Sequence, residues 1–230
     1  LSMDQEFLIS KKAWKMGGSK MFIEVDKKVK VSDLLLGVVV QSGNDASIAI
    51  AEGISGSEEI FALEMNNLAK KIGLTNSNFV NSSGWPNDNH YTTAKDLAKI
   101  AEYTLNEHPK LYEMYAIAEF TYNGIKQDNR NPLLYSFDGA DGFKTGHTQA
   151  AGYGLVGSAE RGDRRLLLVL NGLETSRARA QESLRLMDWG FNNFQLVDFY
   201  NQGEVVIEAT TWLGKKEKVK LSSQQDISVS

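Results

Sequence analysis

Two short polar motifs in the sequence could together carry out chemistry. Ser42-Gly43-Asn44 supplies a hydroxyl and an amide, and Lys144-Thr145-Gly146 supplies a cation, a second hydroxyl and a position without a side chain. A fixed cation and polar donors can stabilise negative charge that develops in a reaction. Lys144 and Gly146 would share one face of a strand, where the missing side chain leaves room for an extended peptide to lie alongside.

Each motif also has a purely structural interpretation. Ser42-Gly43-Asn44 could be a turn between two helices, with Asn44 as a cap, and Lys144 could be a solvated charge that protects a strand edge. His90 and His108 are expected in surface loops, and no pair of the three histidines has the spacing of metal ligands. The two motifs in this order, one between helices and one on a strand, favour the catalytic interpretation.

Hydrophobic periodicity predicts the helices that position the first motif. A nearly all-apolar helix is expected from Asp33 to Gln41 with Ser32 as its cap, and Asp45 begins the next helix. Further helices are predicted after Ser57, from Thr93 to about Glu107, over 110–115, and over about 176–194. Thr93 and Asp96 have the spacing of a capping box, although Asp replaces the usual Glu or Gln.

The second motif falls where the period becomes that of strands. Residues 117–127 predict a hairpin because Asn123-Gly124 lies between alternating residues, and three successive strands follow over 142–148, 152–160 and 164–173. After residue 200 the sequence becomes rich in β-branched residues, which predicts the beginning of a small β domain over 201–230. The fold class expected is α/β (α+β).

Composition excludes several classes of function. The 230 residues are 42% hydrophobic and 23% charged, which is ordinary for a soluble globular protein. A net charge of −4 gives no reason to expect a nucleic-acid partner, and the absence of cysteine excludes thiol catalysis. No metal or other cofactor is expected.

The motifs and their surroundings resemble the low-molecular-mass penicillin-binding proteins, the serine-type D-alanyl-D-alanine carboxypeptidases. The resemblance covers roughly residues 1–200 and includes the stretches LLLGVVVQSGNDASIAIAE, NSSGWPNDNHYTTAKDLAKIA, FTYNGIKQDNRNPLL, DGFKTGHTQAAGYGLVGSA and SLRLMDWGF. It implies a β-lactamase/transpeptidase-like antiparallel sheet flanked by helices, with a helical lobe, in a catalytic domain over 1–200. The substrate implied is a peptidoglycan stem peptide ending in D-Ala-D-Ala, and β-lactams would be inhibitors.

The resemblance also implies roles for the catalytic candidates. In the family a serine attacks the penultimate D-alanine to give an acyl-enzyme that water hydrolyses. Ser42 would pass a proton to the departing amine, Asn44 would hold the substrate amide, and Lys144 would supply positive potential and assist the proton relay.

Five further residues are expected to bind the substrate. Thr145 and Arg179 would bind its terminal carboxylate, and Gly146 would let the peptide lie along the strand. The backbone N–H of His147 would complete an oxyanion hole, and Arg130 matches a family arginine near the site.

One departure from the family pattern limits these expectations. The chain contains no S-x-x-K, the motif that carries the family's nucleophile and base, and the family's order would place that motif before Leu1. The expectation is therefore a fragment of an extracytoplasmic enzyme whose parent is membrane-associated through a missing C-terminal segment. The alternatives are a non-catalytic peptidoglycan-binding relative and a class A-like β-lactamase, for which Glu102-Tyr103-Thr104-Leu105-Asn106 matches the loop motif E-x-x-L-N. Its position within the helix that begins at Thr93 argues against the β-lactamase.

Overall fold

The computed structural model describes residues 1–195 and 197–229. The chain divides into two compact units, Leu1–Met187 and Asp188–Ser230. None of the helices in the described part of the chain is both long and apolar enough to cross a bilayer.

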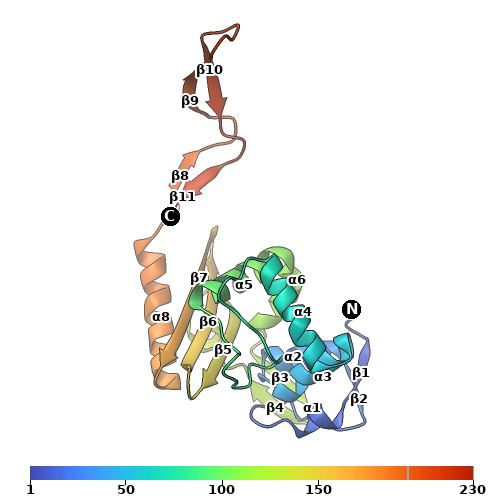
Figure 1. Cartoon of the computed structure of the whole chain (residues 1–230). Helices are drawn as coiled ribbons and strands as arrows, with labels where there is room; N and C mark the ends of the chain where they lie inside the picture. Colours follow the sequence, from blue (N-terminus) through green and yellow to red (C-terminus); the bar gives the residue numbers. More distant parts are fainter. Residues whose placement is uncertain (196, 230) are drawn as a thin grey trace. The chain divides into compact units, whose positions relative to one another are not determined.

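A helical lobe forms the first half of the larger unit (Figure 1). Its elements are β1 (Glu6–Leu8), α1 (Lys11–Lys15), β2 (Lys28–Lys30), α2 (Val31–Val39), α3 (Asn44–Ser55) and α4 (Glu58–Lys71). Strands β1 and β2 pair antiparallel. Side chains from all of these elements except α4 form one buried core that includes Phe7, Ala13, Val29, Leu34 and Ile48. This core fixes the junction between α2 and α3, where the first motif lies.

Most predicted helix starts are confirmed, but the predicted start of α2 is wrong. Ser57 and Thr93 cap their helices as expected, each side chain accepting a hydrogen bond from the third residue on. Helix α2 instead begins at Val31, and no side chain caps it. The N–H groups of Val31 and Ser32 donate to the carbonyls of Gln5 and Met3, so the backbone next to β1 replaces the expected serine cap.

The elements after α4 also differ from the prediction in detail. Helix α5 spans Ala94–Glu107, and the single helix predicted over 110–115 is a short helix α6 (Pro109–Tyr112) followed by the 3-10 helix η1 (Glu113–Ala116). Proline at the first helical position explains the earlier start. The carboxylate of Asp96 accepts from the backbone of Asn76 and the hydroxyl of Ser77, so it anchors that loop.

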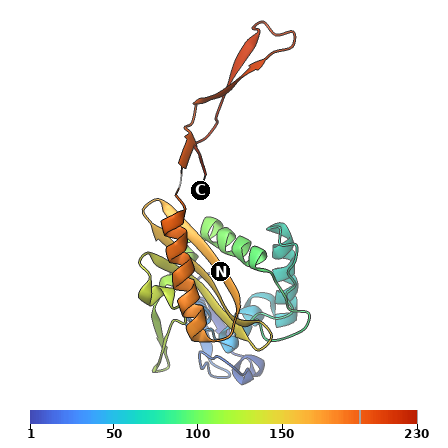
Figure 2. The same ribbon diagram turned by 90° about the vertical axis from the view of Figure 1, so that its left-hand side faces the viewer.

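A three-stranded antiparallel sheet carries the second motif. Strands β5 (Ala140–Thr148), β6 (Gly152–Arg161) and β7 (Arg164–Leu173) lie in the order β5-β6-β7, which confirms the three predicted strands. The hairpin β3 (Glu119–Tyr122) and β4 (Ile125–Asp128) is also confirmed, with both turn residues at positive φ. Helix α5 lies over one face of the sheet, and α8 (Ser176–Asn193) lies over the other (Figure 2).

Close packing of helices against the sheet explains a glycine in its central strand. A Cβ on Gly157 of β6 would lie 2.7 Å from Leu133 of α7 (Leu133–Ser136) and 3.7 Å from Met187 of α8. Both of these side chains are buried. Strand β5 remains at the edge of the sheet, pairing only with β6 among the described residues.

The smaller unit consists of paired strands. Strands β9 (Val205–Thr210) and β10 (Lys218–Ser222) lie in the segment predicted to be rich in strands, and they pair with each other. Strands β8 (Val197–Tyr200) and β11 (Ile227–Val229) also pair and were not predicted. The domain boundary expected at residue 201 stays a prediction.

A buried carboxylate ties the lobe together, and its removal should be costly. Asp45 is 1% exposed and accepts backbone hydrogen bonds from Met21, Phe22 and Ala46 at 2.9 Å each. We expect Asp45→Ala to lower the free energy of unfolding by at least about 3 kcal/mol, because bonds to a charged acceptor are lost and buried N–H groups are left unpaired.

Urea denaturation measures this change. The exposed Asp88 offers a control, and Asp88→Ala should stay within about 0.5 kcal/mol of the parent chain. Equal small effects of both substitutions would show that Asp45 does not support the α2–α3 junction.

Candidate active site

The two motifs meet in the structure although they are far apart in sequence. The Nζ of Lys144 lies 2.9 Å from the Oγ of Ser42 and also donates to the carbonyl of Thr145 at 3.1 Å. Ser42 comes from the α2–α3 junction of the lobe, and Lys144 comes from the edge strand β5. The contact places a hydroxyl and an ammonium within proton-transfer distance.

The backbone around Ser42 is held in an uncommon conformation. Ser42 has a φ of 56°, in the left-handed region that costs a non-glycine residue about 1–2 kcal/mol. The next residue must be glycine, because a Cβ on Gly43 would lie 2.8 Å from the carboxylate of Asp45 and 3.0 Å from the amide nitrogen of Met21. The anchoring of Asp45 in the lobe therefore keeps the Ser42 hydroxyl in place against Lys144.

Asn44 is the first residue of α3, and its side-chain amide donates to the carbonyl of Gly17 at 2.9 Å. Its backbone N–H donates to the carbonyl of Ser19. The turn at Gly17–Ser19 thus fixes the side chain beside Ser42. The role in holding a substrate amide stays a prediction.

Strand β5 presents the second motif at an open edge. Lys144 pairs with Val156 and Gly146 with Gly154 on β6, and the intervening Thr145 is buried and pairs with Leu155. Apart from Gly146 and its two neighbours in the chain, no atom of the described residues lies within 4 Å of the Cβ position on Gly146. The free side of β5 therefore has space for an extended chain next to Lys144.

Arg130 and Arg179 lie near the two motifs. Arg130 donates to the hydroxyl of Ser19 at 2.6 Å, and Arg179 donates at 3.5 Å to the backbone carbonyl of Arg130. The guanidinium of Arg179 also lies over the ring of Tyr153, 5.7 Å from its centroid, and that ring packs on His147 with centroids 3.9 Å apart. All eight residues predicted to form the site thus lie on elements that meet around Ser42 and Lys144.

The site carries an excess of positive charge. Within the described residues, no carboxylate lies within 4 Å of the charged groups of Lys144, Arg130 or Arg179. The Nε of Arg179 is buried and has no hydrogen-bond partner among the described residues. Burial, together with the charges of Arg130 and Arg179, lowers the pKa of Lys144 to about 7. Burial is also the main reason that the pKa of Arg179 is lowered.

This arrangement can do two things chemically. An anion placed among the three cations would be bound by charge-assisted hydrogen bonds. A lysine with a pKa near neutral can both accept and release a proton at physiological pH, and Ser42 provides the hydroxyl through which that proton can travel.

Sequence reasoning missed Tyr153 and the turn at Gly17–Ser19. Antiparallel pairing of the strands around 142–148 and 152–160 would have placed Tyr153 opposite His147, as observed. The run Gly17-Gly18-Ser19 indicated only a turn. Nothing in its local sequence indicates that it packs against Asn44, which lies 25 residues after Ser19.

Comparisons with known proteins agree with this combination of fold and motifs. Residues 1–175 match the family model of D-alanyl-D-alanine carboxypeptidase, peptidase family S11. The chain is 40% identical over 229 residues to D-alanyl-D-alanine carboxypeptidase DacC of Escherichia coli, which covers 96% of this chain and 57% of that protein. The chain belongs to the D-alanyl-D-alanine carboxypeptidase family.

Solved structures agree with this assignment. Penicillin-binding protein 5 from Haemophilus influenzae superposes with a TM-score of 0.89 at 39% identity, covering 99% of this chain and 67% of that one. The ampicillin-bound form of penicillin-binding protein D2 from Listeria monocytogenes gives a TM-score of 0.74 at 32% identity, covering 83% of this chain and 78% of that one. The transpeptidase-like fold expected from the sequence is confirmed. The chain spans little more than half the length of the curated relatives it matches.

The pKa of Lys144 offers a direct test of the site's electrostatics. With a pKa near 7, Lys144 is cationic below that pH and loses its proton as the pH rises through it. We expect Arg179→Ala to raise this pKa, because a neighbouring positive charge is removed. NMR titration of ¹³C-labelled lysine side chains measures both values.

Exposed Arg185 on α8, which pairs with Glu182, supplies the matched control. Arg185→Ala should leave the titration of Lys144 unchanged. A Lys144 that titrates with the ordinary lysines near pH 10 would contradict the excess of positive charge at the site.

Proposed function

We propose that the complete protein is a serine-type D-alanyl-D-alanine carboxypeptidase that removes the terminal D-alanine of peptidoglycan stem peptides. The observation that carries the proposal is the group of three uncompensated cations beside the open edge of β5. A peptide with a free terminal carboxylate supplies the missing negative charge, and its extended backbone fits the unpaired edge next to Gly146.

The chemistry divides between this chain and a motif that it lacks. A serine and lysine from S-x-x-K, outside residues 1–230, provide the nucleophile and base. The serine oxygen bonds to the carbonyl carbon of the penultimate D-alanine, the C–N bond breaks, and the released amine takes a proton through Ser42. Water then hydrolyses the ester. Lys144, 2.9 Å from Ser42, stabilises charge along this route and returns the proton.

Substrate recognition uses residues of this chain. Thr145, Arg179 and Arg130 bind the terminal carboxylate, and Asn44 binds the substrate amide. The backbone N–H of His147 on β5 stabilises the tetrahedral oxyanion, and loss of one such donor typically costs about 3–4 kcal/mol of barrier.

β-Lactams are proposed as inhibitors of the same site, since they carry a carboxylate next to an acylating carbonyl. The ampicillin-bound relative supports this part of the proposal. Because the substrate is part of the cell wall, we place the complete protein outside the cytoplasmic membrane and associated with it through a C-terminal segment.

The carboxylate site predicts a selective kinetic defect. In the complete enzyme, Arg179→Ala should cost about 1.5–3 kcal/mol in kcat/KM on a peptide ending in D-Ala-D-Ala, the range for a charged hydrogen bond. The defect should nearly vanish on the same peptide with an amidated C-terminus. Equal defects on both peptides would show that Arg179 acts by packing α8 and not by binding the carboxylate.

The fate of the penicillin adduct separates this function from that of a β-lactamase. Glu102, within the only E-x-x-L-N string of the sequence, is exposed on α5, and the neighbouring Lys99 donates to the carbonyl of Gly73. Glu102 therefore has no access to a water in the site. We expect the complete enzyme to form an adduct that persists for minutes or longer, with the same lifetime in Glu102→Gln.

Mass spectrometry after removal of free penicillin follows the adduct. The chain of residues 1–230 alone serves as the control, because it lacks S-x-x-K and should form no adduct. Rapid turnover of penicillin that is lost in Glu102→Gln would favour the β-lactamase.

A further inference from the structure

Strand β5 contains one residue more than the segment of β6 with which it pairs. The extra residue lies three positions before Lys144. Ala140 pairs with Ala159, and Gly142 pairs with Ser158, so Asp141 is the extra residue of a β-bulge. The backbone before the bulge is anchored separately, because the N–H of Glu160 donates to the carbonyl of Gly139 at 2.9 Å. The bulge therefore decides how the rest of β5 aligns with β6.

That alignment decides which face of the sheet carries Lys144. With the bulge, Lys144 pairs with Val156 and its side chain reaches Ser42. If Asp141 entered the regular ladder while the upstream pairs stayed fixed, Lys144 would pair with Leu155 instead. A one-residue shift moves every side chain to the opposite face. Lys144 would then lie on the face of the buried Leu155, away from the cluster of cations.

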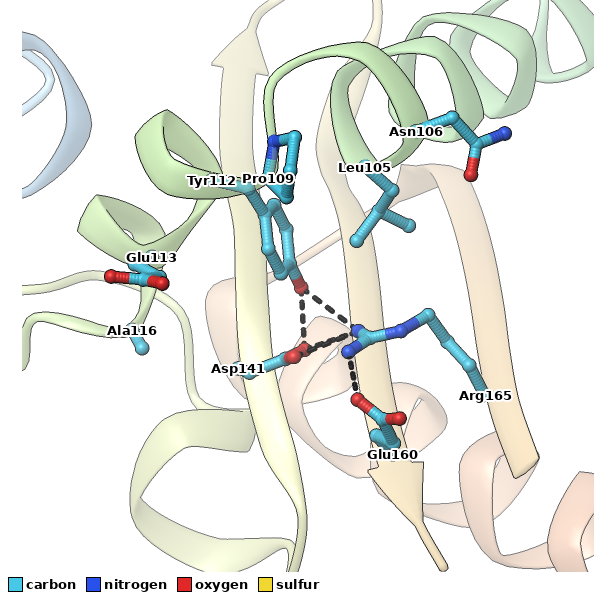
Figure 3. A pocket seen from close by; sticks show the side chains of 9 residues that line it. All are labelled: Leu105, Asn106, Pro109, Tyr112, Glu113, Ala116, Asp141, Glu160 and Arg165. Carbon is cyan, nitrogen blue, oxygen red and sulfur yellow. Dashed lines mark hydrogen bonds and ion pairs between the residues drawn. The ribbon is translucent and has the colours of Figure 1, made fainter. Parts of the chain in front are cut away.

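Two side chains, those of Arg165 and Tyr112, hold the extra residue in place (Figure 3). Arg165 of β7 lies 2.7 Å and 2.9 Å from the two carboxylate oxygens of Asp141, and the hydroxyl of Tyr112 donates to Asp141 at 2.5 Å. Arg165 also donates to the hydroxyl of Ser158 at 2.6 Å and pairs with Glu160. The guanidinium of Arg165, which belongs to β7, thus links the bulge in β5 to two residues of β6, beside a pocket of about 510 Å³.

Packing around Tyr112 supports a specific placement of the bulge. A Cβ on Gly142 would lie 2.9 Å from the Tyr112 hydroxyl, and the rings of Tyr112 and Phe143 lie 4.7 Å apart between centroids. The side chain of Asn131 donates to the carbonyl of Gly142 at 2.9 Å. Burial and the charge of Asp141 raise the pKa of Tyr112, so its hydroxyl stays a donor at physiological pH.

We propose that Asp141, Arg165 and Tyr112 form a register clamp that holds the bulge and thereby sets the face of β5 on which Lys144 lies. They are positioning residues, because they act on the site through Lys144. The clamp deepens the proposed function, and the part of it that concerns catalysis rests on that function.

NMR on the full chain tests the clamp without reference to activity. Cross-strand nuclear Overhauser contacts between β5 and β6 report the register directly. We expect Arg165→Met to weaken the Lys144–Val156 contacts at least about twofold and to produce new Lys144–Leu155 contacts. Arg185→Met, which breaks an exposed pair with Glu182 on α8, is the matched control and should change neither.

Deletion of Asp141 should restore the parental register in Arg165→Met. It would not do so if Arg165 only stabilised the fold. Without the extra residue, Ala140 and Gly142 follow each other in a regular ladder that keeps Lys144 opposite Val156. Arg165→Met should therefore have no effect on the register in the deletion background. Unchanged Lys144–Val156 contacts in Arg165→Met with the bulge present would overturn the proposal.

A milder variant decides the question if Arg165→Met fails to fold. Tyr112→Phe removes only one hydroxyl and should show the same new Lys144–Leu155 contacts to a smaller degree. A folded Tyr112→Phe chain in the parental register alone would then overturn the clamp.

Penicillin acylation of the complete protein separates the clamp from the proposed function. If Arg165→Met is acylated more slowly and the additional deletion of Asp141 restores the parental rate, both the clamp and the catalytic role of Lys144 are supported. A shifted register with unchanged acylation would leave the clamp standing and contradict the catalytic role of Lys144. Slower acylation in the parental register would contradict the clamp.

Discussion

Repulsion among Lys144, Arg130 and Arg179 is the constraint on which the site depends. The structure keeps these like charges together, and burial, together with the charges of Arg130 and Arg179, lowers the pKa of Lys144 to about 7. An arrangement of this kind persists only if the rest of the fold stabilises it. Its effect is a site at which bound negative charge would relieve the repulsion, and a lysine whose proton can be exchanged at physiological pH.

The lobe and the sheet each contribute one half of that arrangement. The buried carboxylate of Asp45 fixes the backbone on which Ser42 is held at positive φ, and the bulge at Asp141 fixes the face on which Lys144 lies. Both anchors are carboxylates: Asp45 accepts hydrogen bonds from backbone N–H groups, and Asp141 binds the side chains of Arg165 and Tyr112. The functional groups are thus positioned by residues whose own contacts are satisfied, whereas the cations themselves are left for a ligand.

The elements that carry the site could be predicted from sequence because their signals are local. The hairpin at Asn123-Gly124, the caps at Ser57 and Thr93 and the strands on either side of residue 150 all depend on residues within a few positions. The start of α2 could not be predicted, because the backbone of Met3 and Gln5, distant in sequence, replaces its cap. The cluster of Arg130, Arg179 and Tyr153 was predicted only in part, since its contacts join β6, α8 and the loop after β4. The bulge at Asp141 was not predicted, because it is defined by the pairing of β5 with β6 and no residue type in the sequence signals it.

The most direct measurement of the central claim is the pKa of Lys144 in the full chain with and without a bound peptide. A peptide ending in D-Ala-D-Ala should raise this pKa when its terminal carboxylate is free, because the carboxylate favours the protonated amine. The same peptide with an amidated end should leave the pKa near its value in the unbound chain. A rise of equal size with both peptides, or none with either, would contradict the account of a site whose cations await a carboxylate.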